Sequence, residues 1–465
     1  SDLHRLTGPY LYTNRCGKPV DELWTNLGPE VINISYTGSR SIIHRVIQID
    51  FSSISAFLTG FSTYPQPLRL RLRIFTIFFL YKQTHQAVRK GELSTIMKLV
   101  FDKADLVKSV GIAMKAVSGK TTMPILECIL IDASSNVIKF TSNDMELGIE
   151  TIVTGMILER GIVALDAKIF SEIVRKLPDN QVTIETDENL VTTITCEKAK
   201  FSIPGQSGED FSYLPILETS DCVSISQFTL KELIRQTIFS IAANENNKLM
   251  TGELFEIKDN TLRVVSLDGH RIAIRRIELK DSYPDRKVVV PGKTLNEISK
   301  ILSGEMDDQI DIYFSENHIM FKFDDTTVVS RLIDGEYFRI DQMLSSDYET
   351  KVTINKKEFL SCIDRATLLV KEGDKKPIII DIQDGAMELQ INSAMGSMKE
   401  EIDINKEGKD IMIGFNPKFL IDALRVIDDE EISIYLVNPK APCFIRNEEE
   451  SYIYLILPVN FNSVR

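Results

Sequence analysis

The chain has 465 residues, which suggests about three domains, and 43% of them are hydrophobic and 26% charged. Its net charge of −13 excludes a uniformly basic surface, although local clusters of Lys and Arg can still bind phosphates. Six scattered cysteines form no C-x-x-C pair, which argues against a cysteine zinc site and a disulfide framework and favours a reducing, cytoplasmic location. The best apolar run, 74–81, is much shorter than the roughly 20 residues that cross a membrane, so we expect no membrane partner.

Residues 1–96 differ in composition from the rest of the chain. They hold 11 Lys and Arg and six Asp and Glu, so that residues 97–465 carry a net charge of −18. No helical or strand period persists in them, and the stretch from Met97 resembles a natural protein start. We therefore expect residues 1–96 to be a translated leader or a cloning extension outside the fold. The alternative is an arginine-rich targeting peptide, because Arg residues flank an apolar stretch near residue 75.

Helices and strands recur in the same order along residues 97–465. The opening helix of each group is predicted at 103–117, 231–242 and 356–370. A short strand is predicted at 161–165, 288–290 and 411–415. The second helix is predicted at 168–177, 293–302 and 418–427, and an alternating strand at 182–184, 310–313 and 432–435. Successive second helices are 125 residues apart, which indicates an internal repeat.

The second helices share one amphipathic pattern. Each has four stripe positions at i, i+3, i+4 and i+7, the spacing of a buried helix face. The stripe residues are Phe170, Ile173, Val174 and Leu177, then Leu295, Ile298, Ser299 and Leu302, then Leu420, Ala423, Leu424 and Ile427. Each helix also carries two basic residues seven apart, which share a face because seven residues are nearly two turns. These pairs are Lys168 with Arg175, Lys293 with Lys300, and Lys418 with Arg425.

These repeats predict an α+β protein with three tandem copies of one domain, in which two helices pack on antiparallel strands. We expect the boundaries at 97–220, 221–347 and 348–465.

Several short stretches on this threefold repeat resemble the sliding clamp, the β subunit of bacterial DNA polymerase III. They are Thr122–Leu126, Leu267–Ile272, Val288–Lys293, Leu332–Gly335, Ile413–Asn416 and Tyr454–Val459. The resemblance covers 97–462 and implies the DNA clamp fold, in which a head-to-tail homodimer closes a six-domain ring around duplex DNA. It also implies a processivity factor without catalytic residues or cofactors. The implied partners are duplex DNA of any sequence, the replicative polymerase, the clamp loader and other clamp-binding repair proteins.

The repeated basic positions suit a ring that binds phosphates weakly and without sequence preference. The predicted DNA-binding residues are Lys168, Arg175, Lys293, Lys300, Lys418 and Arg425, and the resemblance adds Lys120 in a basic loop and matches Lys293 to a second contact. For a single helix, an ordinary solvated face would be the simpler interpretation.

The resemblance also implies an apolar pocket for partner peptides between the second and third domains. The corresponding residues are Met250, Gly269, His270, Arg271, Ile272, Asn416, Phe419, Leu457, Pro458 and Val459. Asp268-Gly269 is also a strong hairpin-turn signal, and 455–459 could equally be a closing core strand. The sequence departs from the family at the rim, where Tyr337-Phe338 replaces a frequent Phe-Pro pair and Ser345 replaces a frequent Pro.

The dimer contact implied by the resemblance joins an apolar residue of the first domain to aliphatic residues of the third. Phe201 matches the first position, and Leu368 and Leu369 are candidates for the second. Phe201 could also be an ordinary core residue.

The sequence does not fit two classes of enzyme. An NTPase would need a P-loop, and both 118–121 and 291–294 end like one, but Met114 and Lys287 occupy the positions where the motif requires Gly. A metal hydrolase would need clustered histidines, and residues 97–465 contain two, so no metal is expected. A repeat scaffold that binds proteins and not DNA remains the alternative to a clamp.

Overall fold

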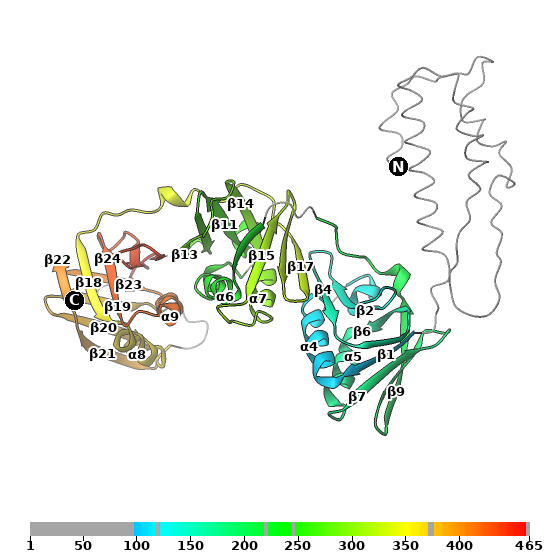
Figure 1. The fold of residues 1–465 in the computed structure, drawn as a ribbon. Coiled ribbons are helices and arrows are strands. Elements are labelled where there is room, and N and C mark those ends of the chain that lie inside the picture. Colours follow the sequence, from blue (N-terminus) through cyan, green and yellow to red (C-terminus); the bar gives the residue numbers. More distant parts are fainter. Residues whose placement is uncertain are drawn as a thin grey trace, which may run out of the picture. The chain divides into compact units, whose positions relative to one another are not determined.

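The computed structural model describes residues 97–461 except Ser118, Lys120, 218–221, 244–246 and 371–375 (Figure 1). The predicted extension at 1–96 and the predicted DNA-binding residue Lys120 lie outside the described residues. Within the described part, no helix is both long and apolar enough to cross a membrane.

The first repeat has two α-helices and nine strands. They are β1 (Met97–Asp102), α4 (Lys103–Ala113), β2 (Cys128–Asp132), β3 (Ile138–Asn143), β4 (Leu147–Val153), β5 (Met156–Glu159), β6 (Ile162–Asp166), α5 (Ala167–Lys176), β7 (Gln181–Thr186), β8 (Val191–Cys196) and β9 (Ala199–Ser207).

The second repeat follows a similar order and adds short 3₁₀ turns after its first helix. Its elements are β10 (Cys222–Ser226), α6 (Gln227–Arg235), η7 (Ile238–Ser240), η8 (Lys248–Thr251), β11 (Gly252–Lys258), β12 (Thr261–Leu267), β13 (Arg271–Glu278), β14 (Arg286–Pro291), α7 (Gly292–Ser299), β15 (Gln309–Phe314), β16 (His318–Phe323) and β17 (Thr326–Arg331).

The third repeat completes the pattern. Its elements are β18 (Thr350–Asn355), α8 (Lys356–Thr367), β19 (Ile378–Gln383), β20 (Ala386–Ser393), β21 (Gly396–Asp403), β22 (Asn405–Gly408), β23 (Ile411–Phe415), α9 (Pro417–Val426), β24 (Glu431–Leu436), β25 (Cys443–Arg446) and β26 (Tyr452–Ile456).

All six predicted helices are present, and the three second helices lie within one residue of their predicted starts. The prediction was wrong for the opening helix of the second repeat, placed at 231–242. That helix starts at Gln227, because the Ser226 hydroxyl caps it by accepting a hydrogen bond from the Thr229 N–H (3.0 Å). It ends at Arg235, after which the chain turns and places Phe239 against Tyr454 of the third repeat.

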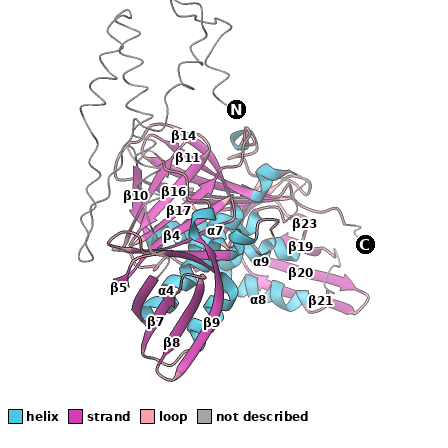
Figure 2. Cartoon of the chain, turned by 90° about the vertical axis from the view of Figure 1, so that its right-hand side faces the viewer, coloured by secondary structure: helices cyan, strands magenta, loops and turns pink. Residues whose placement is uncertain are grey.

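Two sheets each cross a boundary between neighbouring repeats, and Figure 2 shows β17 of the second repeat beside β4 of the first. β17 pairs with β4 in one 13-stranded sheet, and β13 pairs with β26 in one nine-stranded sheet, so each boundary between repeats is an antiparallel ladder. β19, β20, β21 and β23 form a separate sheet. The two helices of each repeat contact each other and bury their apolar stripes in that repeat's core.

Candidate functional site

The second helix of each repeat presents its two basic residues to solvent. In α5, the Asp166 carboxylate caps the helix by accepting a hydrogen bond from the Ile169 N–H (2.7 Å), and Phe170 and Val174 are fully buried. Lys168 and Arg175 are exposed on the same helix, as are the corresponding pairs of α7 and α9. The amphipathic pattern therefore leaves all six predicted basic side chains accessible.

Acidic neighbours divide these six side chains into two groups. Lys293 forms an ion pair with Asp144 of the first repeat. Lys300 pairs with Glu297 (2.7 Å), and Arg425 pairs with Asp364 (3.3 Å). Among the described residues, no acidic side chain forms an ion pair with Lys168, Arg175 or Lys418. These three are the least compensated positive charges of the set. The helical spacing in the sequence does not predict which basic residues have an acidic partner.

The Asp268-Gly269 turn is present and determines the directions in which the side chains of two predicted pocket residues point. The Asp268 Oδ1 atom accepts hydrogen bonds from the N–H groups of His270 (2.9 Å) and Arg271 (3.2 Å), and Gly269 has a φ of +86°, which favours glycine. His270 is exposed, whereas Arg271 is buried. The turn therefore sends one side chain to the surface and the next into the boundary between the second and third repeats.

The start of α9 and the C-terminal tail meet at this turn. The His270 ring stacks on the Phe419 ring with centroids 6.0 Å apart, and the Leu457 N–H donates to the His270 carbonyl (2.9 Å). Asn416 caps α9 by accepting from the Lys418 N–H (3.0 Å). The Val459 N–H donates to the Gly414 carbonyl (2.9 Å), which holds the tail beside the strand before α9. Three distant predicted segments are thus brought together.

Apolar side chains form the adjoining part of this surface. Met250 packs against a core cluster that contains Ile272, Leu267 and Leu455. The two residues that depart from the family, Tyr337 and Phe338, pack against the same cluster. Pro458 is half-buried, and Leu457 has 36% of its surface exposed. An adaptable apolar surface with a few polar groups at its edge is the chemistry that suits a short peptide.

Two residues that support this surface, Asp422 and Phe239, are not predicted by the sequence. Asp422 and the Phe239 carbonyl accept hydrogen bonds from Arg271, and Phe239 packs near its guanidinium. Asp422 lies on α9 between buried positions, and an acidic residue on a helix carries no signal of a distant partner. Phe239 follows α6, whose end the sequence placed too late.

The predicted dimer residues lie on open parts of the first and third repeats. Phe201 is 40% exposed and lies in the part of β9 that pairs with β8 alone, because β6 pairs with β9 from Gly205 onward. Leu368, just after α8, is 75% exposed, and Leu369 is half-buried. Phe201 is therefore not an ordinary core residue.

Family models of the DNA polymerase III beta subunit match all three repeats. The N-terminal domain matches residues 97–215, the central domain 224–338 and the C-terminal domain 341–460. The beta sliding clamp of Staphylococcus epidermidis is 33% identical over 375 residues, which are 78% of this chain and 99% of that protein.

The chain belongs to the DNA polymerase III beta-subunit family, the bacterial sliding clamps. A crystal structure of a putative beta subunit from Eubacterium rectale is 71% identical, covers 78% of this chain and all of that one, and superposes with a TM-score of 0.77. The sliding clamp of Bacillus subtilis is 35% identical, covers 79% of this chain and all of that one, and has a TM-score of 0.76. The resemblance seen in the sequence and the clamp fold are confirmed.

Two thiols of this clamp-family chain are held protonated by burial. Burial raises the pKa of the Cys128 thiol to about 11 and that of Cys443 to about 12, so both stay protonated and unreactive at neutral pH. Among the described residues, no three His, Cys, Asp or Glu side chains cluster as metal ligands. The family is a processivity factor and not a catalyst.

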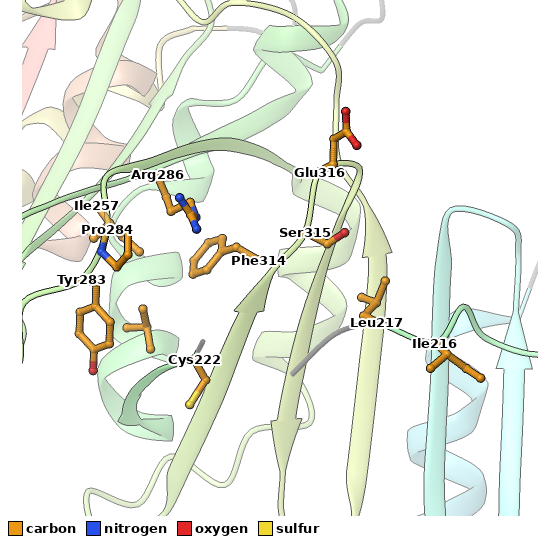
Figure 3. A pocket seen from close by; sticks show the side chains of 11 residues that line it. Ile216, Leu217, Cys222, Ile257, Tyr283, Pro284, Arg286, Phe314, Ser315 and Glu316 are labelled. Carbon is orange, nitrogen blue, oxygen red and sulfur yellow. The ribbon is translucent and has the colours of Figure 1, made fainter. Parts of the chain in front are cut away.

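A separate cavity of about 490 Å³ lies in the second repeat, where Tyr283, Arg286 and Phe314 line it together with Ile216 and Leu217 of the preceding connection (Figure 3). None of the predicted DNA, peptide or dimer residues lines it.

Proposed function

We propose that the chain encircles duplex DNA as a sliding clamp and tethers the replicative polymerase to it. The observation that carries this proposal is the match of three clamp domains over residues 97–460, each with an exposed basic pair on its second helix. Binding by enclosure needs weak, mobile and salt-sensitive phosphate contacts. Lys168, Arg175 and Lys418 are the strongest candidates because no acidic residue in the described part of the chain forms an ion pair with them.

The ring would close through a head-to-tail homodimer. The open part of β9 and the edge strand β21 each lack a second neighbour among the described strands, so they offer backbone groups for an intermolecular ladder. Exposed Lys198 and Lys200 shortly precede Phe201, whereas Glu401 and Asp403 are exposed on β21. Opposite charge and exposed apolar side chains at the two ends of one chain favour a heterologous contact.

Partner proteins would dock on the surface formed by the 268–272 turn, the start of α9 and the 457–459 tail. The polymerase, the clamp loader and clamp-binding repair proteins would share this site, because half-buried Met250 and Phe419 and exposed Leu457 can accept different apolar anchors. The clamp domains would span 97–220, 221–347 and 348–465, and the protein would act in the cytoplasm, where its free cysteines stay reduced.

Retention on circular DNA tests the proposal. The protein is incubated at low salt with nicked circular plasmid, and the complex is separated by gel filtration before and after linearisation. We expect retention on the circle and loss from linear DNA, because enclosure ends when the ring slides off. The triple variant Lys168→Glu, Arg175→Glu and Lys418→Glu should lower retention while remaining dimeric by light scattering. Equal retention on both DNA forms would contradict enclosure.

The alternative is a repeat scaffold that binds proteins and not DNA. It predicts peptide binding without retention on either DNA form, and Phe201→Asp would then leave the assembly state unchanged. For the clamp, Phe201→Asp should favour the monomer, because it places a charge in an apolar contact.

A further inference from the structure

The Arg271 side chain links β13 of the second repeat to α9 of the third. Its Nε donates to Asp268 Oδ2 (3.0 Å), its Nη1 to Asp422 Oδ2 (2.7 Å) and its Nη2 to the Phe239 carbonyl (2.6 Å). The residue is 7% exposed. Each of the three guanidinium nitrogens is therefore committed to a partner within the protein, and little of the side chain is open to a ligand.

Phe419 connects this buried cation to the surface. The guanidinium carbon of Arg271 lies 4.5 Å from the centroid of the Phe419 ring, and the His270 ring stacks on Phe419 with an interplanar angle of 22°. Phe419 is half-buried and His270 is exposed. A planar guanidinium that also satisfies three acceptors fixes both the position and the tilt of the ring.

We propose that Arg271 is a positioning residue of the peptide surface: it sets the place of Phe419 and, through it, His270, and does not contact the bound peptide itself. This inference rests on the proposed docking of partner peptides at this surface. The predicted pocket residues therefore have two roles. Phe419 and His270 contact the bound peptide, whereas Arg271 holds these two side chains in position. Lysine cannot replace it, because an ammonium has neither the fork nor the flat face.

Arg235 provides a matched control. It also joins the second repeat to the α9 end of the third, through an ion pair of 2.9 Å between its Nη2 and Asp428. Its other partner is Glu232, and its side chain is 36% exposed. Neither Glu232 nor Asp428 belongs to the predicted peptide surface. Loss of Arg235 thus removes a second, more exposed link between the same two repeats without touching Phe419.

A double-mutant cycle on the full chain tests the positioning role. The affinity for a fluorescein-labelled peptide from the replicative polymerase is measured by fluorescence polarisation for wild type, Arg271→Gln, Phe419→Ala and the double variant. We expect each single change to weaken binding roughly tenfold, and the double change to be no worse than the weaker-binding single, because both act through one ring. Arg271→Lys should not restore affinity, and Arg235→Gln should bind like wild type.

Losses that multiply in the double variant would overturn the proposal, because Arg271 would then act on the peptide independently of Phe419. An unchanged affinity of Arg271→Gln, or an equal loss in Arg235→Gln, would overturn it as well. If Arg271→Gln does not fold, Asp422→Asn replaces it in the same cycle, with the same non-additive result expected. Failure of the wild type to bind the peptide would instead contradict the proposed docking surface.

Discussion

The two boundaries between repeats use the same ladder geometry but different chemistry. At the first, β4 pairs with β17, and Leu147 and Ile149 of the first repeat are buried in the core of the second. Across this boundary, the buried hydroxyl oxygens of Thr151 and Thr326 form a hydrogen bond of 3.0 Å. Its ion pair joins Lys293, whose side chain is 58% exposed, to the Asp144 carboxylate, which is only 6% exposed. The buried carboxylate keeps other donors, because it also accepts from the backbone N–H groups of Glu146 and Leu147.

At the second boundary, β13 pairs with β26 and the buried contacts include a charge. Arg271 links Asp268 to Asp422, and the Tyr454 hydroxyl donates to the Gln236 carbonyl (3.1 Å). The two boundaries differ in the cation, which is exposed in Lys293 and buried in Arg271. A buried ion network depends on every member, because removing one leaves an unpaired charge. The boundary that carries the proposed peptide surface is therefore the more specific and the more fragile of the two.

Asp422→Leu should have the largest effect on stability. It removes a partner of buried Arg271, and breaking a buried pair costs on the order of 3 kcal/mol or more. The matched change Asp428→Leu removes the partner of half-exposed Arg235 and should cost less than about 1 kcal/mol. Urea unfolding of both variants followed by circular dichroism measures the difference. Equal midpoints would show that the buried network is not the stronger link.

Thr151→Val probes the first boundary. It leaves the buried Thr326 hydroxyl without its partner, which should cost about 1–2 kcal/mol. Replacing both threonines by valine should recover most of this loss, because neither position then holds a buried hydroxyl without a hydrogen-bond partner. Thermal unfolding of the single and double variants gives the comparison. A double variant less stable than the single would mean that packing, not hydroxyl pairing, determines this site.

Glu253 should make the stability of the second repeat depend on pH. Its carboxyl group is fully buried near Thr237, and burial raises its pKa from 4.5 to about 8. The folded state therefore keeps the proton that the unfolded state releases. The stabilisation is fully present below pH 4.5 and is lost as the pH rises through about 8. Thermal midpoints between pH 5 and 9 should fall with pH in wild type and change less in Glu253→Gln. Parallel curves for the two proteins would contradict this assignment.

Lys293→Met should have the smallest effect. Its ion pair with Asp144 crosses the first boundary, and the lysine side chain is 58% exposed whereas the aspartate is 6% exposed. Asp144 keeps the N–H donors of Glu146 (3.0 Å) and Leu147 (2.7 Å) when the lysine is lost, so the change should cost only about 1 kcal/mol. The difference in melting temperature between wild type and variant should shrink further at high salt, because screening weakens exposed pairs. A difference that persists in high salt would show a contact beyond the ion pair.

The sequence predicted the repeated architecture because its signals are local. Helical stripes such as Phe170 with Val174, and the Asp268-Gly269 turn, depend on residues within two turns of each other. Burial of a stripe also implies exposure of the opposite face, so the accessibility of Lys168 and Lys418 followed from spacing. The late placement of α6 has a local cause as well, since the Ser226 cap was not recognised as a helix start.

What the sequence determined by itself is the threefold α+β repeat, the exposed basic faces and the segments that resemble the clamp family. The tertiary structure decided which of those residues meet and which are already paired. Lys293 and Asp144 are 149 residues apart, and Arg271 and Asp422 are 151 apart, so no periodicity relates them. They meet because β4–β17 and β13–β26 join different repeats, and backbone ladders between distant strands bring their neighbouring side chains into contact. Arg271 therefore follows a turn motif that is typical of the protein surface, yet its side chain is buried like that of a core residue.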